Sequence, residues 1–108
     1  MAQDFRRLAV QATNSAGTIV TSNSYDTIIG IRVANILTAA ITLSVWVSVG
    51  GSTTRYIVKD LSIPPASSVE LVQGGAKFVM ESGDVLKVQA SAASAADVYV
   101  SMVDAISA

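Results

Sequence analysis

The sequence contains no cysteine and no histidine. Without cysteine the chain cannot form disulfides, thiolate nucleophiles, zinc knuckles or iron–sulfur sites, and cysteine usage leaves the redox compartment undetermined. Without histidine it lacks the commonest general base and the commonest metal ligand. Together the two absences argue against most enzymes and most metalloproteins.

Charged residues are also scarce, at 14% of the 108 positions. Seven basic and eight acidic residues give a net charge of -1. Binding several phosphates requires a basic excess, so nucleic acid is not an expected partner. Hydrophobic residues make up 51%, far from the composition of a disordered chain. In so short a chain this surplus predicts apolar surface that partner chains cover.

A long uncharged stretch, residues 33–54, has the length of a membrane-spanning helix. From residue 41 to residue 49, however, aliphatic side chains alternate with hydroxyl side chains and Trp46, and a period of two is typical of a β-strand. The first residues carry charge but no apolar segment of the kind that a secretory signal requires. We therefore expect no membrane contact and a protein made in the cytoplasm.

Valine, isoleucine and threonine dominate the regular stretches, and turn residues follow at short intervals, which predicts an all-β protein. We expect one domain over residues 1–108, an antiparallel β-sandwich of jelly-roll-like or immunoglobulin-like type with about eight or nine short strands. Residues 1–12 are a candidate N-terminal docking strand or arm. The predicted strands are residues 5–12, 18–22, 25–34, 41–49, 53–59, 69–73, 77–81, 85–91 and 97–106.

Two local patterns add detail to this prediction. Gly50-Gly51-Ser52 supplies the positive-φ positions of a tight turn, so the strands on either side are predicted to pair as an antiparallel hairpin. The strand at residues 25–34 places Ile29 and Ile31 on one face and Ile28 on the opposite face. Because both faces are apolar, we expect this strand to be central in its sheet.

The acidic residues form no recognisable catalytic or calcium-binding pattern. Most lie at predicted strand ends, and Asp84 and Asp97 are explained as turn formers and solvated gatekeepers. Gly74-Gly75-Ala76-Lys77 lacks the full spacing of a phosphate-binding loop and is predicted as a hairpin turn. No histidine is present to activate the many serine and threonine hydroxyls. We therefore predict no catalytic residues, no cofactor and no metal.

The few aromatic side chains are candidates for contact with a partner. Trp46 lies on the hydroxyl-bearing face of its strand, where a large aromatic is a common interface anchor, and Tyr56 is its predicted cross-strand neighbour. If Trp46 is such an anchor, alanine there weakens self-association; the alternative is that both faces of the strand are covered within one chain. The basic doublet near the N-terminus is either a docking arm or a solvated edge strand. The candidate interface residues are Phe5, Arg6, Arg7, Trp46, Tyr56 and Tyr99.

The chain also contains short strings, mostly within residues 25–106, that resemble a known class of protein. These strings are SYDTIIGIRVAN at residues 24–35, YIVKD at 56–60, Ile63-Pro64, Gly74-Gly75, SGD at 82–84 and SAAS at 91–94. Together they resemble small virion structural proteins of tailed bacteriophages, particularly phages of cyanobacteria. The resemblance implies a non-enzymatic β-sandwich that is repeated on the particle and grouped as trimers, with no family active site.

The resemblance predicts a virion protein, made in the host cytoplasm, that self-associates and decorates or cements the capsid. Its expected partners are copies of itself, as a homotrimer, and other virion proteins such as the major capsid protein. A neck or tail accessory position is the alternative. A different class of function is a fibre module that binds a host-surface carbohydrate, with Trp46, Tyr56 or Tyr99 as the stacking platform, and a glycan array distinguishes it from cementing.

Overall fold

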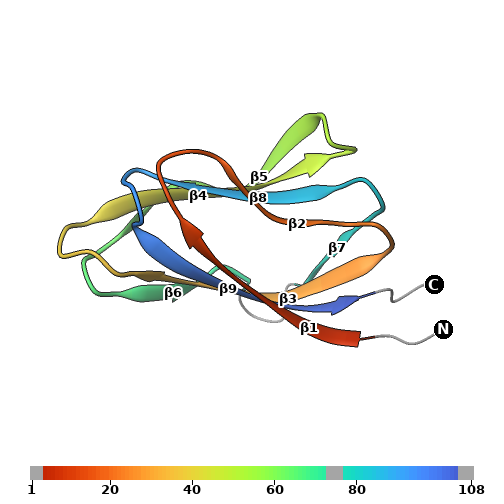
Figure 1. The fold of residues 1–108 in the computed structure, drawn as a ribbon, viewed down its shortest axis with the longest axis horizontal. Coiled ribbons are helices and arrows are strands. Elements are labelled where there is room, and N and C mark those ends of the chain that lie inside the picture. Colours follow the sequence, from red (N-terminus) through yellow and green to blue (C-terminus); the bar gives the residue numbers. More distant parts are fainter. Residues whose placement is uncertain (1–3, 73–76, 105–108) are drawn as a thin grey trace.

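The computed structural model describes residues 4–72 and 77–104. These residues form nine β-strands and no helix, which confirms the predicted all-β class. Figure 1 shows the strands in two layers. In chain order they are β1 (Asp4–Ala12), β2 (Gly17–Thr21), β3 (Asp26–Asn35), β4 (Ile41–Val49), β5 (Thr53–Ile63), β6 (Ser68–Glu70), β7 (Phe78–Met80), β8 (Val85–Ala90) and β9 (Ala96–Asp104).

The two layers are antiparallel sheets, so the predicted sandwich is confirmed. In one sheet β1, β9 and β3 lie side by side, and β6 and β7 pair with opposite ends of β3. In the other sheet the order is β2, β8, β4, β5. The strand β3 is therefore central, as its two apolar faces predict.

The chain is arranged as one long hairpin that is rolled into two layers. Its arms pair β1 with β9, β2 with β8, β3 with β6 and β7, and β4 with β5. The roll closes because β9 also pairs with β3 and β8 also pairs with β4. Since β6 and β7 share one strand position, this nested order is that of an eight-stranded jelly roll and not of an immunoglobulin sandwich.

The tip of this long hairpin is the turn between β4 and β5. Gly50 and Gly51 have φ angles of 63° and 79° there, in the left-handed region that glycine adopts without steric cost. The predicted hairpin is thereby confirmed. In Figure 1 the tip projects beyond the two layers, so its outer residues face solvent.

The core lies between the sheets, where alternate side chains of each strand face the other layer. The pattern is plain in β4, whose odd-numbered aliphatic residues from Ile41 to Val47 are all buried. Burying one such side chain contributes about 1.5–3 kcal/mol, so these rows are the main stabilising element. The largest fully buried apolar side chains are Ile28, Ile31, Leu43, Ile63, Met80, Leu86, Met102, Val33, Val45, Val98 and Val100.

The first half of β3 differs from the sequence prediction. Its pairing with β9 shifts register between Ile28 and Gly30, so Ile29 is an extra residue in a β-bulge. Ile28 is fully buried with Ile31, whereas Ile29 is only partly buried, which reverses the predicted faces. One extra residue in a bulge moves the side chains on one side of it to the opposite face of the strand. Assigning faces by strict alternation therefore fails on one side of the bulge.

The strands β5 and β6 also differ from their predicted extents. β5 continues to Ile63 instead of ending at Lys59, because its ladder with β4 absorbs extra residues as bulges. β6 ends at Glu70, where the chain leaves the ladder with β3. The turn predicted at residues 74–75 and the end predicted for the last strand at residue 106 lie outside the described residues.

Candidate functional site

The six candidate interface residues lie in three separate places. Trp46 and Tyr56 are cross-strand neighbours on the outer face of the β2-β8-β4-β5 sheet. Arg6 is opposite the buried Met102 and so lies on the inner side of β1, at the end of the strand. The outer face of the β1-β9-β3 sheet carries the other three, Phe5, Arg7 and Tyr99.

Trp46 and Tyr56 form the aromatic pair that the sequence predicts. Their ring centroids are 5.8 Å apart and their planes are tilted by 55°, an arrangement that the ring quadrupoles favour over a face-to-face stack. The Nζ of Lys59 lies 5.3 Å from the centre of the Tyr56 ring, within cation–π distance. Tyr56 is still 49% exposed, so the pair borders the solvent and is not part of the core.

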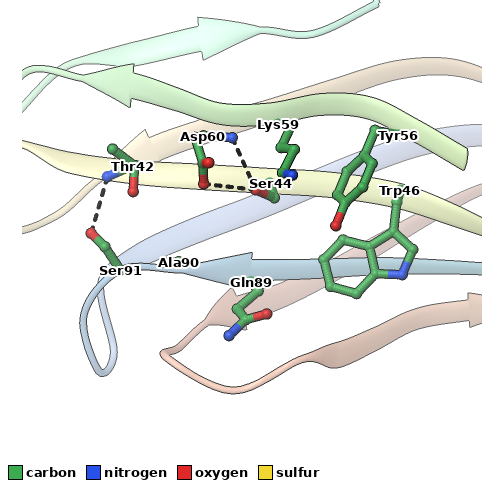
Figure 2. Close-up of a pocket in the computed structure, with 9 residues that line it drawn as sticks. All are labelled: Thr42, Ser44, Trp46, Tyr56, Lys59, Asp60, Gln89, Ala90 and Ser91. Atoms are coloured by element: carbon green, nitrogen blue, oxygen red, sulfur yellow. Dashed lines mark hydrogen bonds between the residues drawn. The ribbon is translucent and has the colours of Figure 1, made fainter. Parts of the chain in front are cut away.

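A groove of about 350 Å³ begins at this aromatic pair and runs along the outer face of β4, between β5 and β8 (Figure 2). The aromatic rings lie at one end, and hydroxyl, carboxylate, amide and ammonium groups line the rest. Its volume is at the small end of ligand pockets, which span about 300–1,000 Å³. The lining residues are Thr42, Ser44, Trp46, Tyr56, Lys59, Asp60, Gln89, Ala90 and Ser91.

Two β-bulges in β5 build this groove. At the first, Lys59 and Asp60 lie together opposite Ser44. At the second, Ile57 is the extra residue beside Tyr56. The first bulge brings two consecutive side chains to the outer face, and the second restores the alternation so that Tyr56 also faces outward. Sequence analysis missed Lys59 and Asp60, although two adjacent polar residues that break the alternation are the signal of such a bulge.

The backbone at the first bulge is strained and held by Ser44. Asp60 has a φ of 52°, a left-handed conformation that costs a residue with a Cβ about 1–2 kcal/mol. Its amide donates a hydrogen bond to the Ser44 Oγ at 3.0 Å, and that hydroxyl donates to the Asp60 Oδ1 at 3.5 Å. Strained residues of this kind cluster at functional sites, where the surrounding structure determines their conformation.

The far end of the groove is closed by a reciprocal pair of hydrogen bonds. The amide of Thr42 donates to the Ser91 Oγ at 3.0 Å, and the amide of Ser91 donates to the Thr42 carbonyl at 2.9 Å. Gln89 reaches the same surface from β8 (Figure 2), and its amide Nε2 donates to the carbonyl of Asn14 at 3.1 Å. Residues of β4, β5 and β8 and of the turn after β8 therefore form the walls of the groove.

The outer face of the other sheet carries an apolar row at one end, beside the exposed charged side chains of Arg7 and Arg32. A row of paired residues crosses it from Phe5 on β1, through Val103 and Thr27, to Val79 on β7. Phe5 is 83% exposed and Val79 is 57% exposed. Tyr99 lies on the same face, further along β9. Exposed apolar side chains that gather on one surface mark contact sites for other proteins. We call the row from Phe5 through Val103 and Thr27 to Val79 the apolar face.

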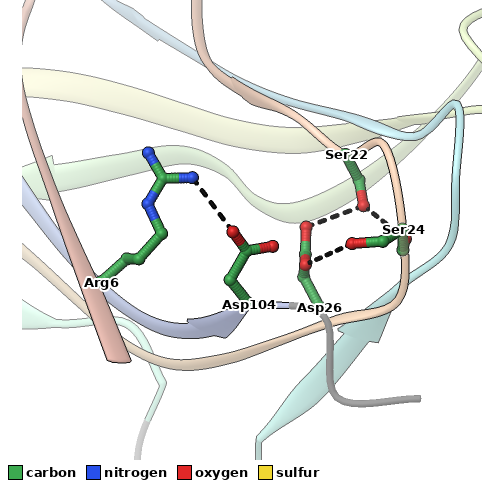
Figure 3. Close-up of polar contacts among 5 residues, drawn as sticks. All are labelled: Arg6, Ser22, Ser24, Asp26 and Asp104. Atoms are coloured by element: carbon green, nitrogen blue, oxygen red, sulfur yellow. Dashed lines mark hydrogen bonds and ion pairs between the residues drawn. The ribbon is translucent and has the colours of Figure 1, made fainter. Parts of the chain in front are cut away.

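Two sets of polar contacts lie at the end of the sandwich where β1 begins (Figure 3). The Nη1 of Arg6 lies 3.3 Å from the Oδ2 of Asp104. Arg6 and Arg7 are consecutive residues of β1, so their side chains point to opposite sides of the sheet and do not form one basic patch. The buried carboxylate of Asp26 accepts hydrogen bonds from the hydroxyls of Ser22 at 2.8 Å and Ser24 at 3.3 Å. These bonds fix the turn that leads from β2 into β3.

The two acidic residues that were predicted as turn formers differ. The carboxylate of Asp84 accepts hydrogen bonds from the amides of Gly50 at 2.9 Å and Glu81 at 3.0 Å, which confirms its role in a turn. Asp97 is the second residue of β9 and is exposed, so it is a solvated charge on the strand and not part of a turn. Over residues 4–72 and 77–104, no group of three or more acidic side chains is placed to hold a metal ion.

Within that same part of the chain, no helix has the length and apolarity that crossing a bilayer requires.

The jelly-roll sandwich defines the class of the protein, and comparisons with known proteins agree at the level of fold. No protein-family model matches the sequence, and no curated protein sequence matches it. Among solved structures, the chain is similar to a protein of Bacillus endospore appendages, described as a novel family of disulfide-linked pili, with a TM-score of 0.52 and 17% identity over 94% of this chain and 83% of that one.

The chain is also similar to a pentameric capsid protein isolated from metagenomic phage sequences. The TM-score is 0.51 and the identity is 15%, over 93% of this chain and 62% of that one. This chain therefore spans less than two thirds of the capsid protein's length. At identities this low, both likenesses establish a shared fold and nothing finer.

Proposed function

We propose that this chain is a non-enzymatic structural protein of a bacteriophage virion that self-associates and decorates or cements the capsid. The observation that carries the proposal is the apolar face, on which Phe5 and Val79 stand 83% and 57% exposed. Covering a side chain as large as phenylalanine is worth about 2 kcal/mol. In a free monomer Phe5 remains exposed to water. Contact with a matching surface on the particle would bury it and would stabilise the complex by this amount.

The fold supports the same proposal. Double-sheet jelly rolls are widely used in viral capsid proteins and lectins, and one structural neighbour of this chain is a phage capsid protein. The pili of the other neighbour are disulfide-linked, but this chain has no cysteine, so contacts between its copies would be non-covalent. Fold likeness by itself does not assign a function, and the proposal therefore depends on the apolar face.

The edge strand β1 extends the apolar face to the side of the sheet. It pairs with β9 and forms one edge of the order β1-β9-β3. An edge strand offers backbone groups for pairing with a second chain, and Phe5 lies on it. In the proposed assembly, residues 1–12 act as a docking strand against a neighbouring copy or the capsid, and the copies group as a homotrimer.

Cementing follows from repeated weak contacts. Each copy contributes a small apolar contact, and simultaneous contact with several capsid subunits turns these into strong overall binding. Because the protein binds the assembled lattice and not the free subunits, it stabilises the shell by mass action. A neck or tail position would use the same surface on a different part of the particle.

Electron microscopy of intact particles tests the proposal directly. The expected result is density for this jelly roll on the outside of the capsid, with its apolar face against the shell or a neighbouring copy. Particles that lack the protein are expected to release their genome at a lower temperature than complete particles. Absence of the protein from purified particles would overturn the proposal, and density at the neck or tail would change the location alone.

A further inference from the structure

We infer that the groove along β4 binds a neutral saccharide, with the Trp46 ring as its stacking surface. This inference goes beyond the structural role proposed above and does not depend on it. The groove is on the β2-β8-β4-β5 sheet, whereas the apolar face is on the opposite sheet. Contacts made by the apolar face therefore leave the groove open to a ligand.

The aromatic end of the groove is suited to the apolar face of a sugar ring. Trp46 and Tyr56 meet at 55°, so they form a corner and not a closed stack. Lys59 lies against the Tyr56 ring. The rings carry a negative π face that attracts the weakly positive C–H groups of a sugar. Trp46 supplies the broad platform and Tyr56 supplies the wall beside it (Figure 2).

The polar end supplies the directional contacts that hydroxyl groups need. The Asp60 carboxylate accepts hydrogen bonds, the Lys59 ammonium donates them, and the Gln89 amide does both. All three line the groove together with the Ser44 hydroxyl. A few convergent polar groups beside an aromatic surface fix the orientation of a small ligand.

The conformation of Asp60 is the second line of support. The bulge holds this residue at a φ of 52°, and the bond from its amide to the Ser44 Oγ keeps it there. β5 is an edge strand, and bulges are common both at sheet edges and beside functional sites. The bulges do place Lys59, Asp60 and Tyr56 on one surface. We attribute them to the groove for that reason.

Charge and size select the ligand class. One cation, Lys59, and one anion, Asp60, line the groove, so it has no net charge to attract a phosphate or a nucleic acid. A volume of about 350 Å³ suits a ligand the size of a monosaccharide or disaccharide. The mainly polar lining also favours a ligand rich in hydroxyl groups over an apolar segment of another protein.

The experiment uses Trp46 as its own reporter, since it is the only tryptophan in the chain. The purified full-length protein is titrated with the methyl glycosides of glucose, galactose, mannose and N-acetylglucosamine while tryptophan emission is recorded. We expect the tryptophan emission to change and to saturate with at least one glycoside at concentrations below about 100 mM, as a Kd in the millimolar range predicts. No change with any of the four would overturn the inference.

Matched variants separate the groove from the rest of the surface. Tyr56→Ala and Asp60→Asn are each expected to weaken binding by about tenfold or more, because the first removes the aromatic wall and the second replaces a charged acceptor with a weaker neutral one. Asparagine tolerates the left-handed backbone as well as aspartate, so Asp60→Asn keeps the fold. Tyr99→Ala is the control: Tyr99 is as exposed as Tyr56, at 49%, but lies on the other sheet, and binding is expected to change by less than about twofold.

Three results would count against the saccharide. An equal loss in Tyr99→Ala would show that binding is not in the groove. Binding of glucose 6-phosphate alone, without any neutral glycoside, would mean an anion site. A Trp46 emission that depends on protein concentration and not on sugar would mean that a second copy covers the groove. None of these results bears on the proposed virion role, because electron microscopy of intact particles tests that role without any sugar.

Discussion

The carboxylate of Glu70 on β6 accepts a hydrogen bond from the backbone amide of Ile31 on β3 at 2.7 Å. The same oxygen accepts from the amide of Val72 at 3.2 Å. Ile31 lies next to the β3 bulge, where the ladder with β9 is irregular. The Glu70 side chain therefore supplies the acceptor for the Ile31 amide at this point. A built Cβ on Gly30 would lie 3.6 Å from this carboxylate, so the two residues are closely packed.

We expect Glu70→Ala to lower the free energy of unfolding by about 1.5–3 kcal/mol, because it removes a charged acceptor from a partly buried amide. Urea unfolding measures the change. Glu81→Ala is the control, since Glu81 is an exposed carboxylate, and it is expected to shift stability by less than about 0.5 kcal/mol. Equal losses in the two variants would contradict a specific role for Glu70.

Asn35 is a buried amide at the end of β3, with 3% exposure. Its Nδ2 donates toward the carbonyl oxygens of Ala39, Ile63 and Pro64 at 3.0–3.1 Å, and its Oδ1 accepts from the amide of Leu37 at 2.9 Å. The side chain thus ties the crossover between the sheets to the end of β5.

Asn35→Ala leaves these backbone groups without their partner, and we expect it to cost about 3 kcal/mol of unfolding free energy. Asn14→Ala, in an exposed loop, is expected to cost less than about 0.5 kcal/mol. Thermal unfolding followed by circular dichroism measures both. A stable Asn35→Ala protein would mean that water replaces the side-chain amide.

Alanine is expected to affect the free energy of unfolding differently at Gly51, in the turn between β4 and β5, and at Gly17, in β2. Gly51→Ala forces a Cβ into a φ of 79° and is expected to cost about 1–2 kcal/mol. Gly17 has no positive φ, and a Cβ there would meet one backbone oxygen at an ordinary 3.9 Å. Gly17→Ala is therefore expected to be neutral or to stabilise by up to about 1 kcal/mol. Denaturant midpoints for the two variants check the difference in sign.

The apolar face predicts which substitutions weaken self-association. Phe5→Ser and Val79→Ser are each expected to raise the dissociation constant of the oligomer by about tenfold or more, because buried aromatic and aliphatic anchors dominate contacts of this kind. Both side chains are largely exposed within one chain, so the unfolding free energy of the monomer is expected to stay nearly constant.

Analytical ultracentrifugation over a range of concentrations measures this effect. Ile36→Ser is the matched control, since Ile36 is also an exposed aliphatic residue, at 47%, but lies between β3 and β4 and away from the apolar face. A loss of association in Ile36→Ser as large as in Phe5→Ser would place the contact elsewhere. A wild-type protein that stays monomeric at all concentrations would contradict self-association in solution.

Sequence reasoning identified the pair Trp46 and Tyr56, because a tight turn sets the register of a hairpin. It did not identify Lys59 and Asp60, whose bulge breaks the alternation on which such reasoning depends. It also named Tyr99 as an alternative stacking platform to Trp46 or Tyr56, and the structure has Tyr99 on the opposite sheet, away from the groove.

The amino-acid sequence alone determined which segments become strands, where the central hairpin turns and which side chains of most strands face inward, because these features depend on neighbours a few residues apart. Tertiary structure alone decided the jelly-roll order, the bulges in β3 and β5, and the lining of one groove by both Gln89 and Trp46. Each of these depends on pairing between segments far apart in the chain. Such pairing is selected by how two whole sheets pack together, and no local pattern encodes it.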